Sequence, residues 1–460
     1  MTPAGGRLRV AFASPLPPAR TGIADYAGEL LPYLAEHLDL EVFTERPAEA
    51  PADLAARFPI APLRELPAAL ASGRRDLAFY QLGNSAEFHG DIYRLLLAHP
   101  GVVLLHEFVL HHLVRELTYP AGFAEAMRYS HGATGERAAR RFLAGGGPAD
   151  PWTFPLFEQA VDASLAVVVH NRETRDRVLA SRPLADVSVV PHHFDATLLP
   201  GAVDRLAARA ALGLPRDAFL VGTFGHVTPA KRMEATLAAF ARLRRELPAA
   251  RLLVVGEVSP HYDFAAVLAA HGSDGVELRG RVGLDEMLRA MVAVDVAVNL
   301  RWPSGGETSG TSMRLLGLGK PVVVSNAGSF AELPDGCCAK VEVDWTEEET
   351  LLATLRLLAA EPELRRSMGE QAQRYMAAVH APERVAAGMA AALERVARER
   401  PRPFHRVPPL LPYPPDDLAT ALTAELAAAA ADLGVAESDD EALAALAAAV
   451  VGMGADRWRS

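Results

Sequence analysis

In the first half of the chain, short apolar or β-branched runs alternate with segments whose apolar residues recur at helical spacing. This alternation is typical of a parallel sheet whose strands are connected by helices on both faces. A longer helical stretch, residues 107–147, interrupts it, and we expect an insertion that forms part of a cleft wall. The predicted strands of this half are 8–13, 40–44, 76–82, 102–105, 165–169 and 187–190, and the predicted helices are 23–36, 134–143 and 172–180.

The alternation restarts after a less regular segment, residues 196–215. Two successive α/β sets predict two facing Rossmann-like domains, at 1–200 and 216–380, with ligands at the carboxyl ends of the strands in the cleft between them. A helix at 381–400 is expected to return to the first domain, and residues 401–460 form a Pro-rich linker and an Ala-rich helical tail. The predicted strands of this half are 219–224, 251–255, 276–279, 296–300, 321–325 and 339–343, and the predicted helices are 233–247 and 284–294.

Composition narrows the class of protein. With 460 residues, 50% hydrophobic and 22% charged, the chain has the balance of a globular protein of two domains. A net charge of −11 argues against a nucleic-acid binder. The only cysteines, Cys337 and Cys338, are adjacent, which suits neither a disulfide framework nor a metal site and favours the reducing cytoplasm. Without an apolar span, we expect at most peripheral contact with a membrane. Composition leaves the oligomeric state open.

The segment 302–325 is the most informative in the chain. It places Glu307 just before a Gly/Ser/Thr-rich turn that opens an apolar helix. Unpaired N–H groups and the positive end of the helix dipole can hold a phosphate or diphosphate there, with Gly310, Thr311 and Ser312 as its contacts. A carboxylate repels phosphate but accepts hydrogen bonds from sugar hydroxyls, so Glu307 and Thr308 are assigned to a sugar. A well-capped helix without a ligand is the alternative.

A second candidate lies where strand 219–224 runs into the sequence GHVTPAKR, ahead of a helix. A cation just before a helix N-terminus is unfavourable unless an anion lies between the two, so Lys231 and Arg232 are predicted diphosphate ligands. The first strand–helix junction has the same layout, and Gly22 would allow close backbone approach to a ligand. Asp25 beside it is either a ligand or a first-turn partner of the helix dipole.

Polar residues also follow two apolar strands of the first half. His106 ends strand 102–105 and is expected to contact a bound substrate, and Asn84 at the end of strand 76–82 could line the same cleft. Glu107, His111 and His112 follow His106 and raise the question of a metal site. No second well-spaced ligand cluster supports one, so no metal is expected.

Taken together, these residues resemble the family-four retaining glycosyltransferases, also called glycosyltransferase group 1, which have a two-domain B-type fold. The similarity extends to about residue 400. Lys231 matches the family's diphosphate-binding lysine, His106 its strand-end histidine that touches the donor sugar, and Gly22 its N-terminal glycine loop. The residues 191–195, PHHFD, match the strand end before the domain linker.

Two positions depart from the family pattern. His226 stands where many members have an arginine that contacts the diphosphate. The family also places a second glutamate, which holds the ribose, seven residues before a proline; counting back from Pro321 gives Arg314. An arginine cannot accept hydrogen bonds from hydroxyls, although it can bind phosphate or an acidic neighbour. The resemblance therefore covers sugar and phosphate better than the nucleoside.

The resemblance implies a hexosyltransferase-type glycosyltransferase that moves a sugar from a nucleoside-diphosphate sugar to an unidentified saccharide, lipid-linked or small-molecule acceptor, with retention. It would need no bound cofactor. The implied catalytic residues are His106, Glu307 and Lys231. Two alternatives stay open: a nucleotide-sugar epimerase-like enzyme, for which the sequence shows no obvious carboxylate pair, and a catalytically silent nucleotide-binding member.

Overall fold

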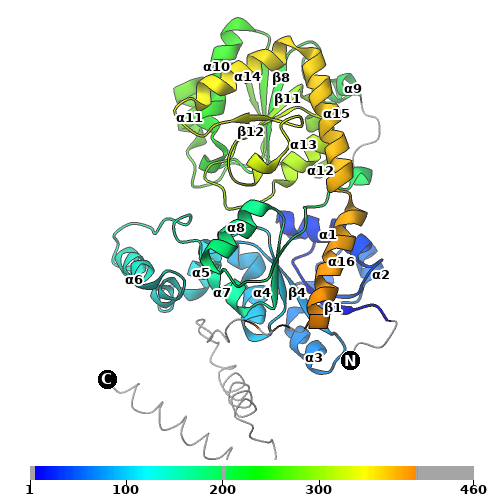
Figure 1. Ribbon diagram of the computed structural model, residues 1–460. Helices are drawn as coiled ribbons and strands as arrows, with labels where there is room; N and C mark the ends of the chain where they lie inside the picture. Colours follow the sequence, from blue (N-terminus) through cyan, green and yellow to red (C-terminus); the bar gives the residue numbers. More distant parts are fainter. Residues whose placement is uncertain (1–5, 199–203, 400, 402, 404–460) are drawn as a thin grey trace, which may run out of the picture. The chain divides into compact units, whose positions relative to one another are not determined.

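The computed structural model of the chain describes residues 6–198, 204–399, 401 and 403. Within this part the chain forms two parallel β-sheets with helices on both faces (Figure 1). The predicted fold of two Rossmann-like domains is thereby confirmed, whereas the predicted tail at 401–460 falls almost wholly outside the described residues. Each predicted strand corresponds to an observed one, with ends that differ by one or two residues.

The first sheet has seven strands in the order β3-β2-β1-β4-β5-β6-β7. Its strands are β1 (Arg9–Ala13), β2 (Asp39–Thr44), β3 (Ile60–Pro62), β4 (Leu77–Leu82), β5 (Val102–Leu105), β6 (Ala166–Val169) and β7 (Val187–Val189). The helices of this half are α1 (Gly22–Leu34), α2 (Ala52–Arg57), α3 (Leu66–Ala71), α4 (Ala86–Ala98), α5 (His111–Thr118), α6 (Phe123–Leu143), α7 (Glu158–Ala163) and α8 (Arg172–Ser181), with short 3₁₀ turns η1 (Pro47–Glu49) and η2 (Leu63–Glu65).

The second sheet has six strands in the order β10-β9-β8-β11-β12-β13. Its strands are β8 (Leu220–Phe224), β9 (Arg251–Val255), β10 (Val276–Leu278), β11 (Val296–Asn299), β12 (Val322–Ser325) and β13 (Ala339–Val341). The remaining helices are α9 (Arg205–Leu212), α10 (Met233–Glu246), α11 (Phe264–His271), α12 (Leu284–Ala293), α13 (Gly310–Gly317), α14 (Glu347–Ala360), α15 (Pro362–Val379) and α16 (Pro382–Glu399), with 3₁₀ turns η3 (Ala196–Leu198), η4 (Pro229–Lys231) and η5 (Gly328–Glu332).

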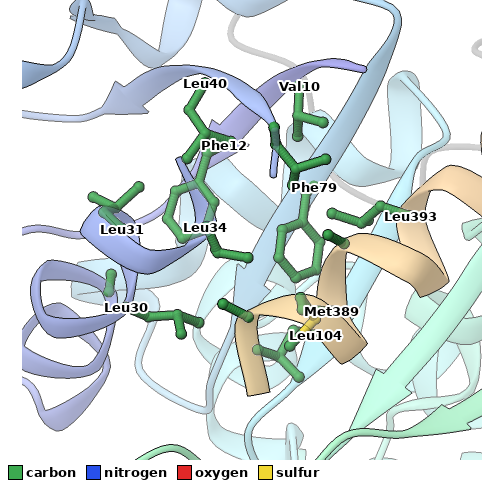
Figure 2. Packing of buried hydrophobic residues seen from close by; sticks show 14 of the residues in the cluster. Val10, Phe12, Leu30, Leu31, Leu34, Leu40, Phe79, Leu104, Met389 and Leu393 are labelled. Atoms are coloured by element: carbon green, nitrogen blue, oxygen red, sulfur yellow. The ribbon is translucent and has the colours of Figure 1, made fainter. Parts of the chain in front are cut away.

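The first sheet is covered on one face by α1 and α16, which share a single apolar core (Figure 2). Phe12 and Phe79 from neighbouring strands meet edge to face with ring centroids 5.7 Å apart. Met389 and Leu393 of α16, far away in the sequence, pack into the same cluster. Each fully buried side chain of this size contributes about 1.5–3 kcal/mol relative to an exposed one. This burial fixes α16 to the first sheet.

The second sheet is buried on both faces. Along β9, Leu252 belongs to one apolar cluster and its neighbour Leu253 to the other. Because successive side chains of a strand point to opposite faces, helices must cover both sides of this sheet. The continuous apolar runs in these strands follow from that burial.

Two expectations about irregular regions are wrong. The segment predicted as irregular before the second sheet contains α9, which ends at Gly213 in a left-handed conformation with φ +68°. The predicted insertion does form helices, but α5 packs against α4, and α6 packs against α5 and α7. From residue 108 to 147 no side chain is among those that line the main cavity described below. The helices face their neighbours in the first half, so they do not form a cleft wall.

Candidate functional site

A cavity of about 950 Å³ lies at the carboxyl ends of both sheets. Its first wall comes from the loop between β1 and α1, from α1 itself, and from the residues that follow β5, β6 and β7. Its second wall comes from the residues that follow β8 and β9, the start of α12, and the start of α13 with the loop before it. This placement agrees with the expectation for open parallel sheets.

The second wall contains a small cradle around Gly225. This residue has φ +87°, and a Cβ atom built on it would lie 3.4 Å from Lys231 Nζ and 3.2 Å from Thr311 Oγ1. The Lys231 ammonium donates to Phe224 O and, at 3.1 Å, to Asn299 Oδ1. Since an ammonium has three donors, one remains for a ligand. Burial, reinforced by the nearby Arg301 guanidinium, lowers the pKa of Lys231 to about 7.

Helix α13 completes the cradle with its N-terminus. Gly310 and Thr311 start the helix and line the cavity, so their N–H groups are first-turn donors without a carbonyl partner inside the helix. Ser312 is different, and its predicted contact with the diphosphate is corrected. It is fully buried, its N–H donates to Ser309 Oγ at 3.2 Å, and its Oγ accepts from Asn299 Nδ2 at 2.7 Å.

Glu307 lies on the same wall, and both of its carboxyl oxygens have partners. Its Oε1 is 2.9 Å from Arg301 Nη1, and its Oε2 accepts from Gly305 N at 2.7 Å and from Ser304 Oγ at 3.3 Å. Sequence reasoning missed Arg301, which follows β11 by two residues. Its position just after β11 does not by itself distinguish a site residue from a solvated arginine. Thr308 also lines the cavity, and its Oγ1 accepts from Asn171 Nδ2 at 3.3 Å.

The floor on the first wall consists of uncharged rings. Tyr26 of α1 packs against His106, His170 and His192, with centroid distances of 4.8, 5.2 and 4.8 Å. His106 Nε2 is 3.1 Å from Gln81 Oε1. Burial lowers the pKa of all three histidines, so they are neutral imidazoles. His106 thus lies in the cavity wall, and its neighbours Tyr26, His170 and His192 were not identified from the sequence.

Glu107 follows His106 and also lines the cavity. Burial, together with the Glu307 charge, raises the pKa of Glu107 to about 8. Its Oε1 accepts from the N–H of Asn84 at 3.2 Å. The prediction that Asn84 lines the cavity is corrected. Its Oδ1 accepts from the N–H groups of His112 and Leu113 at 2.9 and 3.1 Å. Asn84 therefore caps α5 and does not line the cavity.

The structure also corrects the prediction that Arg232 is a diphosphate ligand. Its Nε lies 3.0 Å from Glu347 Oε2, and Arg232 is not among the residues that line the cavity. It adopts a left-handed backbone with φ +54°, which turns its side chain toward the start of α14. The nearby carboxylate satisfies the guanidinium, so Arg232 is not free to bind a diphosphate.

Gly22, His226 and Arg314 line the cavity, whereas Lys231 lies behind Gly225 and is not itself among the lining residues. Nothing lies within 4 Å of a Cβ atom built on Gly22, so the space above this glycine is open to a ligand. His226 follows Gly225 in the wall. Arg314 forms an ion pair with Glu29 of α1, on the opposite wall, and Glu29 Oε2 is 3.3 Å from His193 Nε2. The arginine that departs from the family pattern thus joins the two halves.

Hydrogen bonds to the backbone of residues 305 and 306 also join the halves beside the cavity. Phe108 N donates to Gly305 O at 2.7 Å, and Asn171 Nδ2 donates to Gly306 O at 2.8 Å. The glycine-rich loop before Glu307 is therefore docked on the first half. Within the described residues there is no group of three or more His, Cys, Asp or Glu side chains able to hold a metal ion. The same part of the chain has no helix long and apolar enough to cross a membrane.

Comparison with known proteins bears on the second half most directly. Residues 216–360 match the family model described as Glycosyl transferases group 1. The chain is 34% identical over 231 residues to D-inositol 3-phosphate glycosyltransferase of Stackebrandtia nassauensis, covering 45% of this chain and 50% of that protein. The protein of the same name from Segniliparus rotundus is 32% identical over 191 residues, covering 40% and 41%. The chain thus spans about half the length of the curated relatives it matches.

Solved structures show the same fold at low sequence identity. Sucrose-phosphate synthase from Thermosynechococcus elongatus superposes with a TM-score of 0.61 at 16% identity, covering 85% of this chain and all of that one. HepE of Anabaena, solved in complex with UDP and glucose, superposes with a TM-score of 0.60 at 15% identity, covering 84% and 100%. Residues 216–360 therefore match the group 1 glycosyltransferases, which confirms this part of the resemblance inferred from the sequence.

Proposed function

We propose that the chain transfers a sugar from a nucleoside-diphosphate sugar to a hydroxyl group of an acceptor, in the cavity between the two sheets. The observation that carries this proposal is the cradle around Gly225. A buried cation, a hydroxyl group and a helix N-terminus converge there on space that no side chain fills. Such a cradle suits a diphosphate, and it lies in the segment that matches the group 1 glycosyltransferases.

Different residues are proposed to bind the diphosphate and the sugar, according to their charge. Lys231 and the N–H groups of Gly310 and Thr311 stabilise the negative charge that develops on the departing diphosphate, because they are in place before the reaction. On the sugar, Glu307 accepts hydrogen bonds from hydroxyl groups, and His106 contacts it from the opposite wall. Since Lys231 supplies the positive charge, the proposed reaction requires no metal ion and no bound cofactor. Retention of configuration is proposed from the family resemblance.

The comparisons suggest where to look for the substrates. HepE was solved with UDP and glucose, so uridine diphosphate and its sugar esters are the first donors to test. The curated relatives are named for D-inositol 3-phosphate, so a phosphorylated cyclitol belongs in the acceptor panel beside simple saccharides. Both are starting points for this chain.

The test is a thermal-shift screen of nucleoside diphosphates and their sugar esters. A ligand at 100 times its Kd stabilises the native state by about 2.7 kcal/mol, which raises the melting temperature. We expect this shift for the wild type and its loss in Lys231→Ala. Lys340→Ala is the matched control, because Lys340 pairs with Asp335 outside the cavity. We expect turnover to be lost in Lys231→Ala and in Glu307→Ala.

Equal shifts in wild type and Lys231→Ala would contradict the donor site. A shift without turnover of any donor would instead identify a nucleotide-binding protein that is catalytically silent.

One observation favours a second candidate, an epimerase-like enzyme that acts on a nucleotide sugar. Such an enzyme needs an acid and a base on the sugar, and Glu107 and Glu307 line the same cavity. The products distinguish the two candidates. Free monosaccharide or an epimerised sugar formed without any acceptor would favour the epimerase, whereas acceptor-dependent release of nucleoside diphosphate favours the transferase.

A further inference from the structure

Two carboxyl groups, one from each half, meet at the cavity. Phe108, next to Glu107, donates its N–H to Gly305 O at 2.7 Å, and Gly305 donates its own N–H to Glu307 Oε2 at the same distance. Both glutamates line the cavity. The contact between the two halves therefore brings their carboxyl groups into one site, although 200 positions separate them in the sequence.

The two carboxyl groups have unequal surroundings. Glu307 is paired with the Arg301 guanidinium and accepts two further hydrogen bonds, from Gly305 N and Ser304 Oγ. Glu107 accepts one hydrogen bond, from Asn84 N, and among the described residues it forms no salt bridge. Two neighbouring carboxylates repel each other, so one proton is retained by the pair. The donors around Glu307 stabilise its charge, which leaves the proton on Glu107.

The other titratable groups nearby leave this assignment unchanged. Arg301 attracts both carboxylates but is bonded to Glu307, and the ammonium of Lys231 is hydrogen-bonded to Phe224 O and Asn299 Oδ1. His106, adjacent to Glu107 in the chain, is a neutral imidazole and brings no positive charge. The partly buried position adds a desolvation cost for an ionised Glu107.

We propose that Glu107 contacts the substrate as a neutral carboxylic acid and donates a hydrogen bond to an oxygen of the sugar held between the two halves. The location of that sugar rests on the proposed function; the protonation of Glu107 does not. A carboxylic acid donates a hydrogen bond, whereas a carboxylate only accepts. Glu107 and Glu307 thus form a donor–acceptor pair that fixes one sugar oxygen as an acceptor and an adjacent hydroxyl as a donor.

Kinetics test the hydrogen bond. The activity of the wild type should fall as the pH rises through about 8, where Glu107 loses its proton. Glu107→Gln keeps a donor that cannot ionise, so it should keep most of the activity and lose the part of the decline that centres on pH 8, while the loss of charge on Lys231, whose pKa is about 7, is common to both proteins. Glu107→Ala should lose activity on the order of 100-fold, as for other donors at a reacting centre. A Glu107→Gln variant with the wild-type decline, or one as inactive as Glu107→Ala, would overturn the proposal.

Infrared spectroscopy tests the proton without any substrate. The wild-type minus Glu107→Gln difference spectrum should show a protonated carboxyl band below pH 8, because the band of Glu158, whose pKa burial raises to about 7, is present in both proteins and cancels. In Glu307→Gln the same band should disappear at lower pH, because the repelling charge is gone and Arg301 is free to attract Glu107. A difference spectrum without this band would show that Glu107 does not hold the proton. If the bands behave as expected but no sugar nucleotide is bound or turned over, the proposed function fails and the protonation of Glu107 stands.

Discussion

The cradle side of the second wall and the floor of the first wall differ in charge. The second wall carries buried or half-buried charged groups, Lys231, Arg301 and Glu307, together with a helix N-terminus. The floor of the first wall is built from neutral rings, among them Tyr26 and His106. Charged groups suit a diphosphate, and neutral hydrogen-bonding rings suit hydroxyl groups. We infer that the second half binds the nucleotide end of the donor and that the first half contributes chiefly to the reacting sugar.

The largest effect expected from this difference is a separation of binding from turnover. His106→Phe keeps a ring in the floor but removes its hydrogen bond to Gln81 Oε1 and any bond to substrate. We expect turnover to fall on the order of 100-fold, because one positioned polar group is lost at the reacting centre. The Kd for nucleoside diphosphate, measured by calorimetry, should change less than about twofold, since that ligand occupies the other wall.

The matched control is His112→Phe, in which an exposed histidine of α5 outside the cavity is replaced. It should leave both quantities unchanged. If His106→Phe weakened nucleoside diphosphate as strongly as it slowed turnover, the two walls would share one ligand group, and the division by charge would be wrong.

A smaller effect concerns the pH dependence of stability. Burial lowers the pKa of Lys231 to about 7 in the folded state, from 10.5 for an ordinary lysine. Between these values the unfolded chain binds more protons at this residue, so the free energy of unfolding should rise with pH. The rise is at most about 1.4 kcal/mol per pH unit for one group. Denaturant unfolding of the unliganded protein at several pH values measures it.

Lys231→Met removes this titration while keeping the length of the side chain. Subtracting its stability profile from that of the wild type isolates Lys231 from other groups such as Lys320, whose pKa burial lowers to about 8. Parallel profiles for the two proteins would mean that Lys231 is not a desolvated cation, and the charged character of the second wall would lose its main support.

The difference between the two walls also explains which site residues could be predicted from the sequence. Lys231 and Glu307 were recognisable because each lies at a strand-to-helix junction, where a charge conflicts with or suits the helix terminus. Arg301 was missed because an arginine after a strand is indistinguishable from a solvated one until its partner is known. Tyr26 and His170 come from distant segments, and only the strand order β1-β4-β5-β6 brings them together.

Hydrogen-bonding partners explain the predictions that failed. Arg232, Asn84 and Ser312 have the residue types expected for a site. Each is engaged elsewhere: Arg232 by Glu347, Asn84 by the first N–H groups of α5, and Ser312 by Asn299. A local motif shows which groups can bind a ligand, but only the packed structure shows which of them still have a free donor or acceptor.

The smallest effect concerns the ion pair that crosses between the walls. Arg314 and Glu29 are both partly exposed, so their pairing should stabilise the protein by no more than about 1 kcal/mol. A double-mutant cycle with Arg314→Met, Glu29→Gln and the double variant measures this coupling by denaturant unfolding. The Kd for nucleoside diphosphate should change less than about threefold, since Arg314 faces Glu29 and the cradle does not include it. A much larger loss of affinity in Arg314→Met, with no loss in Glu29→Gln, would instead make Arg314 a direct ligand of the nucleotide and add it to the charged wall.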